Sequence, residues 1–263
     1  MDLKLAKKIA LVTGSTAGIG NAIAASLARE GATVIVNGRS PAAVEAAVAA
    51  MKAETKGDVI GFAGDLSVDS VAETLVHRHP VVDILVNNLG IFEVKAFEEI
   101  SDADWRRFFD VNVLSGARLS RLYLPSMRKR NWGRIIFISS ESGYHIPAEM
   151  IHYGMTKAAQ IAVARGLAET TAGTGITVNS VLPGPTRSRG VGDFVAEMAA
   201  KSGQSAQTVE SEFFKTARPT SLLQRFATPE EVAAMVAYVA SPLSSATNGA
   251  ALRVDGGAIK SAF

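Results

Sequence analysis

Short apolar runs alternate with alanine- and leucine-rich segments along the whole chain. The apolar runs have the length and composition of buried strands, and they are residues 7–14, 32–39, 58–66, 82–90, 134–139, 175–184 and 250–257. The segments between them have the composition and end signals of helices, and they include residues 21–30, 41–53, 68–77, 101–130, 151–171 and 228–240. This alternation predicts an α/β, Rossmann-like fold, in which about seven strands form a doubly wound parallel sheet with helices on both faces.

The rhythm is interrupted once. Residues 188–225 contain helical pieces but no strand, and they carry the apolar side chains of Phe194, Met198, Phe213 and Phe214. We interpret this segment as a lid over an apolar substrate, with an extra packed helix pair at a subunit contact as the alternative. No linker, repeat or low-complexity tract divides the chain, so we expect residues 1–263 to form a single domain.

Composition argues against several classes of function. The 27 basic and 25 acidic residues are well mixed and leave a net charge of +2, which gives no case for a nucleic-acid partner. There is no cysteine, and the four histidines show no metal-binding spacing, so no metal site is expected. Residues 1–8 are too short for a signal peptide, and no run of about 18 apolar residues predicts a membrane span. We therefore expect a cytoplasmic protein without a membrane partner.

A glycine-rich turn, TGSTAGIG, joins the first strand to the first helix. Its glycines permit a tight turn and a close approach of phosphate to the backbone, and the helix that follows offers free N–H groups to an anion. The spacing is GxxxGxG and not the GxGxxG of the common dinucleotide fingerprint, so a plain glycine turn is the alternative. We favour a nucleotide site, whose candidate residues in this turn are Gly14, Ser15, Thr16, Gly18 and Gly20; a family resemblance described below adds Ile19.

Arg39 directly follows the second strand, where the ribose 2′ position of a dinucleotide is read. No acidic side chain stands at Asn37 or Gly38 to bond a free 2′-hydroxyl. A guanidinium suits a 2′-phosphate, so we predict NADP as the cofactor, with NAD as the alternative. Ser40 and Ser15 could add hydrogen bonds, while a merely solvent-exposed arginine is the competing interpretation.

Polar residues and glycines also follow three other strands, at the sheet edge where ligands bind in such folds. Asp65 and Leu66 end the third strand, where they could touch an adenine ring, although an aspartate there could equally cap the next turn. The motif NNLG ends the fourth strand and contributes Asn88 and Gly90. The motif PGPTRS follows the sixth strand, and its candidate contacts to a carboxamide are Pro183, Gly184, Thr186 and Ser188.

Tyr153 and Lys157 stand four residues apart in a predicted helix, so their side chains share one face. A free tyrosine has a pKa of about 10, and an ammonium about 5 Å away would lower it by roughly two units. The pair could therefore transfer a proton, with Ser140 at a strand end to bond a substrate oxygen. Taken alone, the pair is better explained as an amphipathic surface turn, because such pairs are common.

Jointly, TGSTAGIG, NNLG, Asn112, Ser140 and the Tyr153-x-x-x-Lys157 pair resemble the classical short-chain dehydrogenase/reductase family over nearly the whole chain. The chain is similar to 3-oxoacyl-(acyl carrier protein) reductase-like members, but Leu89 replaces the usual alanine of NNAG. The resemblance implies that Tyr153 is the general acid/base, that Lys157 holds the nicotinamide ribose and lowers the tyrosine pKa, and that Ser140 orients the substrate. It implies that Asn112 holds a water that relays protons to Lys157.

The resemblance also implies a small-molecule carbonyl or alcohol substrate and a homotetramer. We thus predict an NADP(H)-dependent oxidoreductase that transfers a hydride to or from a carbonyl or secondary alcohol, including 3-oxoacyl compounds. Two alternatives stay open at this point. One is a dinucleotide-binding sensor or scaffold without turnover, and the other is an NAD-dependent alcohol, sugar or steroid dehydrogenase of the same fold.

Overall fold

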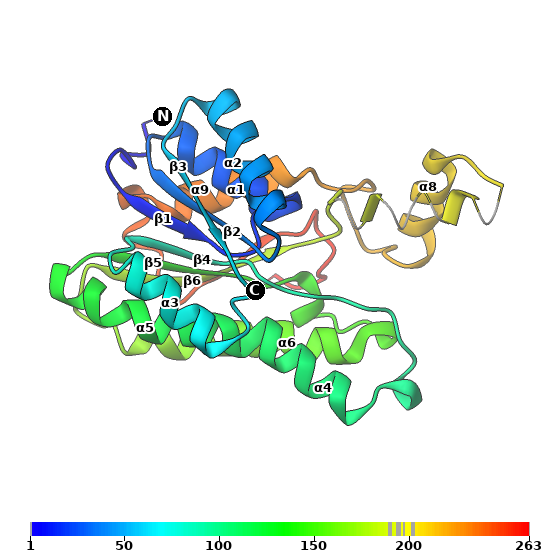
Figure 1. Ribbon diagram of the computed structural model, residues 1–263. Coiled ribbons are helices and arrows are strands. Elements are labelled where there is room, and N and C mark those ends of the chain that lie inside the picture. Colours follow the sequence, from blue (N-terminus) through cyan, green and yellow to red (C-terminus); the bar gives the residue numbers. More distant parts are fainter. Residues whose placement is uncertain (1, 189–190, 193–195, 197, 201–202, 263) are drawn as a thin grey trace.

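The computed structural model describes residues 2–188, 191–192, 196, 198–200 and 203–262. Within these residues seven parallel strands form one sheet in the order β3-β2-β1-β4-β5-β6-β7 (Figure 1). The strands are β1 (Ile9–Val12), β2 (Thr33–Gly38), β3 (Val59–Ala63), β4 (Ile84–Asn87), β5 (Gly133–Ile138), β6 (Ile176–Pro183) and β7 (Ala251–Val254). The predicted doubly wound parallel sheet is confirmed.

Helices cover both faces of this sheet, in layers above and below it in Figure 1. The helices are α1 (Gly18–Arg29), α2 (Pro41–Thr55), α3 (Asp69–Arg78), α4 (Asp102–Phe109), α5 (Ser115–Arg130), α6 (Ile151–Glu169), α8 (Ala206–Thr216) and α9 (Pro229–Ala240). Helices α1, α2 and α9 pack on one face, and α3, α5 and α6 on the other. None of the helices in the described ranges is long and apolar enough to cross a membrane.

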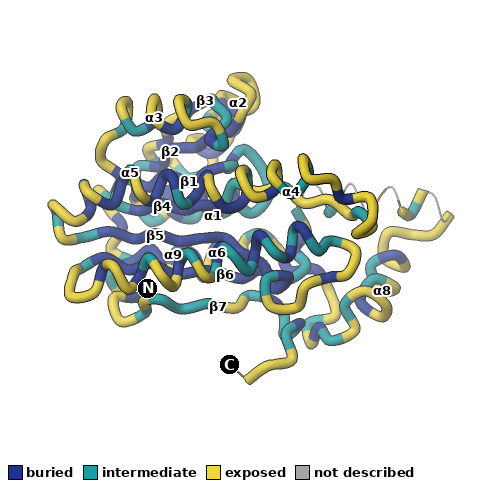
Figure 2. The backbone as a smooth tube through the Cα atoms, turned by 90° about the horizontal axis from the view of Figure 1, so that it is seen from below, coloured by how far each residue is buried: buried dark blue, intermediate teal, exposed yellow. Residues whose placement is uncertain are grey.

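The two hydrophobic cores follow from the two-residue period of the strands. In β1, Val12 points into the core beneath α1 and α9, whereas its neighbour Leu11 points into the core beneath α3 and α5. In β2, Val36 and Ile35 divide in the same way. Figure 2 shows the central strands buried and the outer helix surfaces exposed. This explains why the strands are continuous apolar runs and not alternating ones.

Capping side chains begin several helices. Ser40 caps α2, which has Pro41 in its first turn, and Ser101 forms a capping box with Asp104 at the start of α4. The predicted helix over residues 101–130 is present but contains one π-helical turn, Asp110–Leu114, between α4 and α5. This turn contains Asn112, whose carbonyl is bonded from outside its own helix, as described below.

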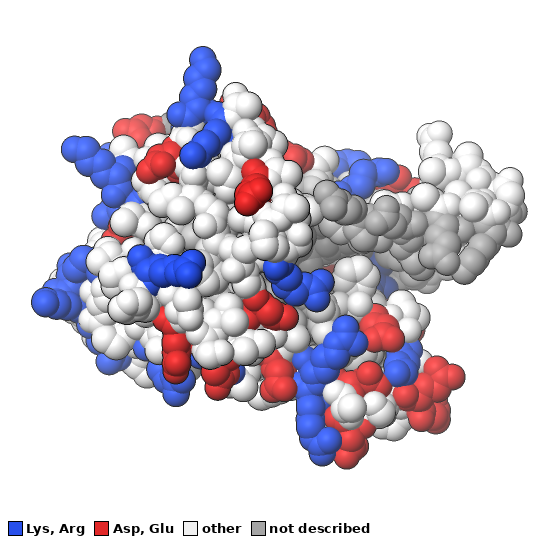
Figure 3. All heavy atoms as spheres, viewed as in Figure 1, with Lys and Arg blue, Asp and Glu red and all other residues white. Residues whose placement is uncertain are grey.

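The sheet order reverses between β1 and β4, which places a crevice at the carboxyl ends of the central strands. The segment with α8 projects beyond this edge of the sheet (Figure 1). Basic and acidic side chains are interspersed over the face seen in Figure 3, as the mixed charge of the sequence predicts. The strand ends and the projecting segment together enclose the candidate site.

Candidate active site

The side chain of Asn88 supports the glycine turn after β1 by hydrogen bonds. The Asn88 side-chain amide donates to the carbonyls of Thr13 and Gly14, at 2.9 and 3.0 Å. A Cβ on Gly20 would lie 2.5 Å from the Asn88 amide nitrogen and 2.5 Å from the Gly14 carbonyl oxygen, so a side chain at residue 20 would collide with this support. Gly14 and Gly18 have positive φ angles of 60° and 59°, which glycine adopts without strain.

Helix α1 begins at this turn without any side-chain cap and without an acidic residue in its first turn. Helices α2, α4, α8 and α9 each receive a serine or threonine cap. The first N–H groups of α1 thus have no capping side chain, and an anion such as a pyrophosphate is a suitable partner for them. This arrangement fits a dinucleotide.

A small pocket of about 200 Å³ lies beside the turn. Arg39, which is exposed, stands at its rim, and Leu89 forms part of its wall. The pocket is also lined by Gly14, Thr16, Ala17, Asn37, Gly38, Gly64, Asp65 and Leu66. The residues predicted to read the ribose and the adenine thus meet at one place.

Two side chains of this region are committed to internal bonds. Ser15 is fully buried, and its hydroxyl donates to the Val12 carbonyl at 2.7 Å and accepts from the Asn37 N–H at 3.0 Å. The expectation that the Ser15 hydroxyl bonds a 2′-phosphate is therefore wrong, because that hydroxyl supports the turn instead. Ser40 remains at the surface, where its hydroxyl caps α2.

Asp65 caps the following turn, since its carboxylate accepts from the N–H and the hydroxyl of Ser67 at 3.0 and 2.6 Å. This is the simpler of the two roles that the sequence allowed, although Asp65 also borders the small pocket. The Leu66 side chain is 1% exposed and packs in the core. Its contribution to a ligand is thus confined to the backbone.

A larger cleft of about 650 Å³ adjoins the turn and gathers most of the other predicted residues. It is lined by Ile19, Asn88, Gly90, Ser140, Tyr153, Lys157, Pro183, Gly184, Thr186 and Ser188. A Cβ on Gly18 would be 3.4 Å from the Ser188 Cβ, so the glycine turn touches the loop after β6. Residues far apart in the sequence therefore form one continuous surface.

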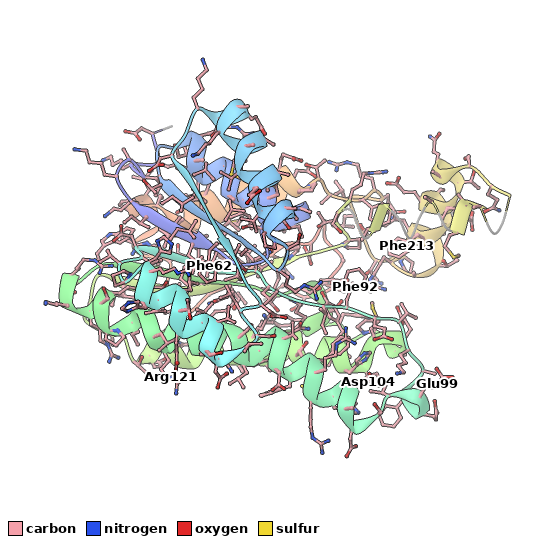
Figure 4. All side chains as sticks on the ribbon, viewed as in Figure 1. Phe62, Phe92, Glu99, Asp104, Arg121 and Phe213 are labelled. Atoms are coloured by element: carbon pink, nitrogen blue, oxygen red, sulfur yellow. The ribbon has the colours of Figure 1, made fainter. Side chains whose placement is uncertain are left out.

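Apolar side chains line part of the cleft. Phe92 and Phe213, labelled in Figure 4, reach it from the loop after β4 and from α8. Met198 also lines the cleft, whereas Phe214 is buried in a small cluster with Val209 and Phe226, both of which do line the cleft. The fourth apolar residue predicted for the lid, Phe194, lies outside the described residues.

Tyr153 and Lys157 face the cleft from α6, and the Tyr153 hydroxyl interacts with Ser140. The Lys157 ammonium lies 5.5 Å from the centre of the tyrosine ring and donates to the Ile138 carbonyl at 2.9 Å. Burial raises the pKa of Tyr153, and the nearby Glu141 carboxylate adds to this, while the bond with Ser140 and the Arg218 charge oppose it. Burial also lowers the pKa of Lys157 to about 7.

The predicted depression of the tyrosine pKa by Lys157 is therefore not produced by the residues of this chain alone. The physical reason is desolvation, which disfavours the charged forms of both groups.

Asn112 is fully buried and binds the loop after β4 at both ends of its amide. It accepts from the Ile91 N–H at 2.8 Å, and it donates to the Ile91 carbonyl at 3.0 Å and to the Thr156 hydroxyl at 2.9 Å. Its backbone carbonyl accepts from the Gln160 amide at 2.6 Å. Gln160 also accepts from the Lys157 ammonium at 3.1 Å.

The Gln160 side chain thus links the backbone carbonyl of Asn112 to the Lys157 ammonium. We had not singled out Gln160 in the sequence. The sequence feature that could have identified Gln160 is its position three residues after Lys157, which places it on the same face of the helix.

The sequence also did not draw attention to Glu141 and Arg218, which line the cleft beside Ser140. The Glu141 carboxylate accepts from the Ser140 hydroxyl at 2.6 Å and from the Arg218 Nε at 2.9 Å. The two residues are 77 positions apart, so no local pattern could have paired them.

The chain is similar in sequence and fold to proteins of a known family. Residues 8–199 match the sequence pattern of the family described as short chain dehydrogenase. An uncharacterized oxidoreductase of Bacillus subtilis is 47% identical over 264 aligned positions, which cover 100% of both chains. The 3-oxoacyl-acyl-carrier-protein reductase of Aquifex aeolicus is 34% identical over 261 positions, which cover 98% of this chain and 99% of that one.

Among solved structures, L-sorbose reductase from Gluconobacter frateurii, complexed with NADPH and L-sorbose, superposes with a TM-score of 0.93. Its identity is 29%, and the match covers 99% of this chain and 100% of that one. Since the family pattern spans most of the chain and these relatives align along its whole length, this protein belongs to the short-chain dehydrogenase/reductase family of oxidoreductases.

Proposed function

We propose that this protein is an NADP(H)-dependent oxidoreductase that transfers a hydride between the nicotinamide and a carbonyl or secondary alcohol. The observation that carries the proposal is the meeting of Ser140, Tyr153 and Lys157 in one cleft that adjoins the glycine turn. A surface helix turn would have left Lys157 exposed, but it is 5% exposed and bonded on two sides. A buried Lys157 beside Tyr153 in the cleft favours an enzyme over a sensor without turnover.

The chain's own residues fit a phosphorylated dinucleotide. The uncapped start of α1 suits a pyrophosphate, and Gly20 is required because a side chain there would strike Asn88. Asn37 uses its whole amide internally, which leaves the exposed Arg39 to read the ribose 2′ position. The solved L-sorbose reductase holds NADPH, which supports the same preference here.

We assign the cofactor contacts to the residues around the two pockets. They are Gly14, Thr16, Gly18, Ile19, Gly20, Arg39, Ser40, Asp65, Leu66, Asn88, Gly90, Tyr153, Lys157, Pro183, Gly184, Thr186 and Ser188, with Ser15 supporting the turn from inside.

When bound, NADP(H) supplies or accepts the hydride. In carbonyl reduction Tyr153 donates its hydroxyl proton to the substrate oxygen, and in alcohol oxidation it takes that proton back. Ser140 would hold the same oxygen by a hydrogen bond, for which its hydroxyl proton must turn away from the Glu141 carboxylate. Lys157 supplies positive charge beside the phenolate that Tyr153 becomes, and Gln160 and the Ile138 carbonyl hold its ammonium in place.

The decisive experiment compares Tyr153→Phe with the wild type and with a control, Tyr144→Phe. Tyr144 is 53% exposed, so its loss removes a phenol of the same kind outside the proposed acid/base pair. We expect Tyr153→Phe to bind NADPH, measured by fluorescence titration, but to lose NADPH oxidation with carbonyl substrates by about a thousandfold or more. Full activity in Tyr153→Phe would rule the assignment out.

The substrate class that we infer includes 3-oxoacyl compounds, in line with the Aquifex relative's name. A single domain over residues 1–263, the lid role of residues 188–225, a homotetramer and a cytoplasmic location remain predictions. Sedimentation analysis of the purified protein would test the tetramer.

A further inference from the structure

A buried carboxylate stands next to the reacting groups. Glu141 is 5% exposed and follows Ser140 directly. One oxygen of its carboxylate accepts from the Ser140 hydroxyl and the Ser142 N–H, each at 2.6 Å, and from the Ser142 hydroxyl at 2.9 Å. The other oxygen accepts from the Arg218 Nε at 2.9 Å. Its negative charge is thus fixed at the side of the cleft where the substrate oxygen would bind.

The cation facing this carboxylate, Arg218, is itself already paired. The Arg218 side chain is 12% exposed, and its Nη1 donates to the Ala217 carbonyl at 2.8 Å. The same nitrogen lies 3.7 Å from a carboxylate oxygen of Glu149, and the guanidinium lies 6.0 Å from the centre of the Phe213 ring. Arg218 is therefore shared between two carboxylates before any ligand arrives.

Carboxylates outnumber cations on the described part of the cleft wall. Glu141, Glu149 and Glu212 line it, against Arg218 and the proposed catalytic Lys157. Glu212 also pairs with Lys215 at 2.9 Å, outside the cleft lining. Most of the remaining wall is apolar, and includes Ile91, Phe92, Val94, Met150, Phe213 and Phe226. Such a wall suits an uncharged, largely apolar body.

We propose that the substrate is an uncharged carbonyl compound or alcohol, and that carboxylate substrates of the same skeleton are discriminated against by Glu141 and Glu149. This inference rests on the proposed function. A carboxylate one or two carbons from the reacting carbon would lie within several ångströms of Glu141, because Glu141 bonds Ser140 directly. The like charges repel across a partly desolvated cleft, and the single positive charge of Arg218 already faces two carboxylates, Glu141 and Glu149.

The test uses ethyl acetoacetate and acetoacetate, which share the reacting carbonyl and differ in the charge of the neighbouring group. NADPH oxidation by the intact enzyme gives kcat/KM for each. We expect the ester to exceed the acid by about tenfold or more, the discrimination that one like charge at this distance supplies. In Glu149→Gln the ratio of ester to acid should fall several-fold, whereas Glu45→Gln, on the exposed surface of α2, should leave the ratio unchanged.

An acid turned over as well as the ester, or better, would overturn the inference while leaving the proposed function intact. Arg218→Met sharpens this outcome, because a selective loss of activity toward the acid would show that Arg218 recruits a substrate carboxylate. If neither compound nor any member of a panel of neutral ketones oxidised NADPH, the proposed function would fall, and this inference with it.

Discussion

Asn37 offers the sharpest test of how the cofactor edge is built. An acidic residue at the end of the second strand is the usual reader of a free ribose 2′-hydroxyl, so Asn37→Asp looks like a route to NADH preference. The structure predicts otherwise. The Asn37 amide is 2% exposed, and it donates to the Phe62 and Gly64 carbonyls at 3.1 and 3.0 Å. Its oxygen accepts from the Gly14 N–H at 3.2 Å.

The aspartate carboxylate could still accept from the Gly14 N–H. Its second oxygen, however, would replace the amide NH₂ that now donates to the Phe62 and Gly64 carbonyls. Each carbonyl loses its buried partner, at about 1–3 kcal/mol, and faces a negative charge. We expect a loss of about 3–5 kcal/mol in the free energy of unfolding. For a chain of this size that lowers Tm by roughly 6–20 °C. Burial raises the pKa of such a carboxyl in the folded state. The loss in the free energy of unfolding should therefore shrink in acid, where the carboxyl is protonated in both the folded and the unfolded protein.

The assay is urea or thermal unfolding of Asn37→Asp beside the wild type, with NADPH and NADH titrations of the folded protein. Asn248→Asp is the matched control, because Asn248 is exposed and uses only its side-chain oxygen, which accepts from the Val178 N–H at 2.8 Å. The control should lose under about 1 kcal/mol. An Asn37→Asp protein with wild-type stability, or one that gains NADH affinity, would refute the reasoning.

Three further changes test the site. Arg39→Ala should weaken NADPH binding by about tenfold to a hundredfold and leave NADH binding nearly unchanged, since it removes a charged contact to the 2′-phosphate alone; equal losses in fluorescence titrations would contradict this. Gln160→Leu should lower kcat by about tenfold and shift its pH profile, because Lys157 loses an acceptor; an unaltered profile would exclude that role. Lys157→Met tests the lysine's burial. Because the folded pKa is lowered to about 7, the unfolded state binds more protons from there up to about pH 10. The wild type should therefore gain about 2–4 kcal/mol of stability across that window relative to the variant, and parallel urea curves would disprove it.

Local patterns determined much of this protein. Short apolar runs marked the strands, and their alternation with helices predicted a parallel sheet, because parallel strands need crossovers. Helix-start signals, Ser101 with Asp104 and Pro229 with Glu230, marked the beginnings of α4 and α9. The spacing of Tyr153 and Lys157 put both side chains on one helix face, since that relation depends only on 3.6 residues per turn.

Contacts between distant segments decided the rest. Whether Ser15 and Asn37 face a ligand or the interior depends on how β1, β2 and β3 pack, and the structure turns both inward. The link between Gln160 and Asn112 spans 48 residues, and the pair of Glu141 with Arg218 spans 77. Local periodicity identifies the face on which a side chain lies. Only the packed fold identifies the partner it meets there, because hydrogen-bond commitment and desolvation are set by neighbours remote in the chain.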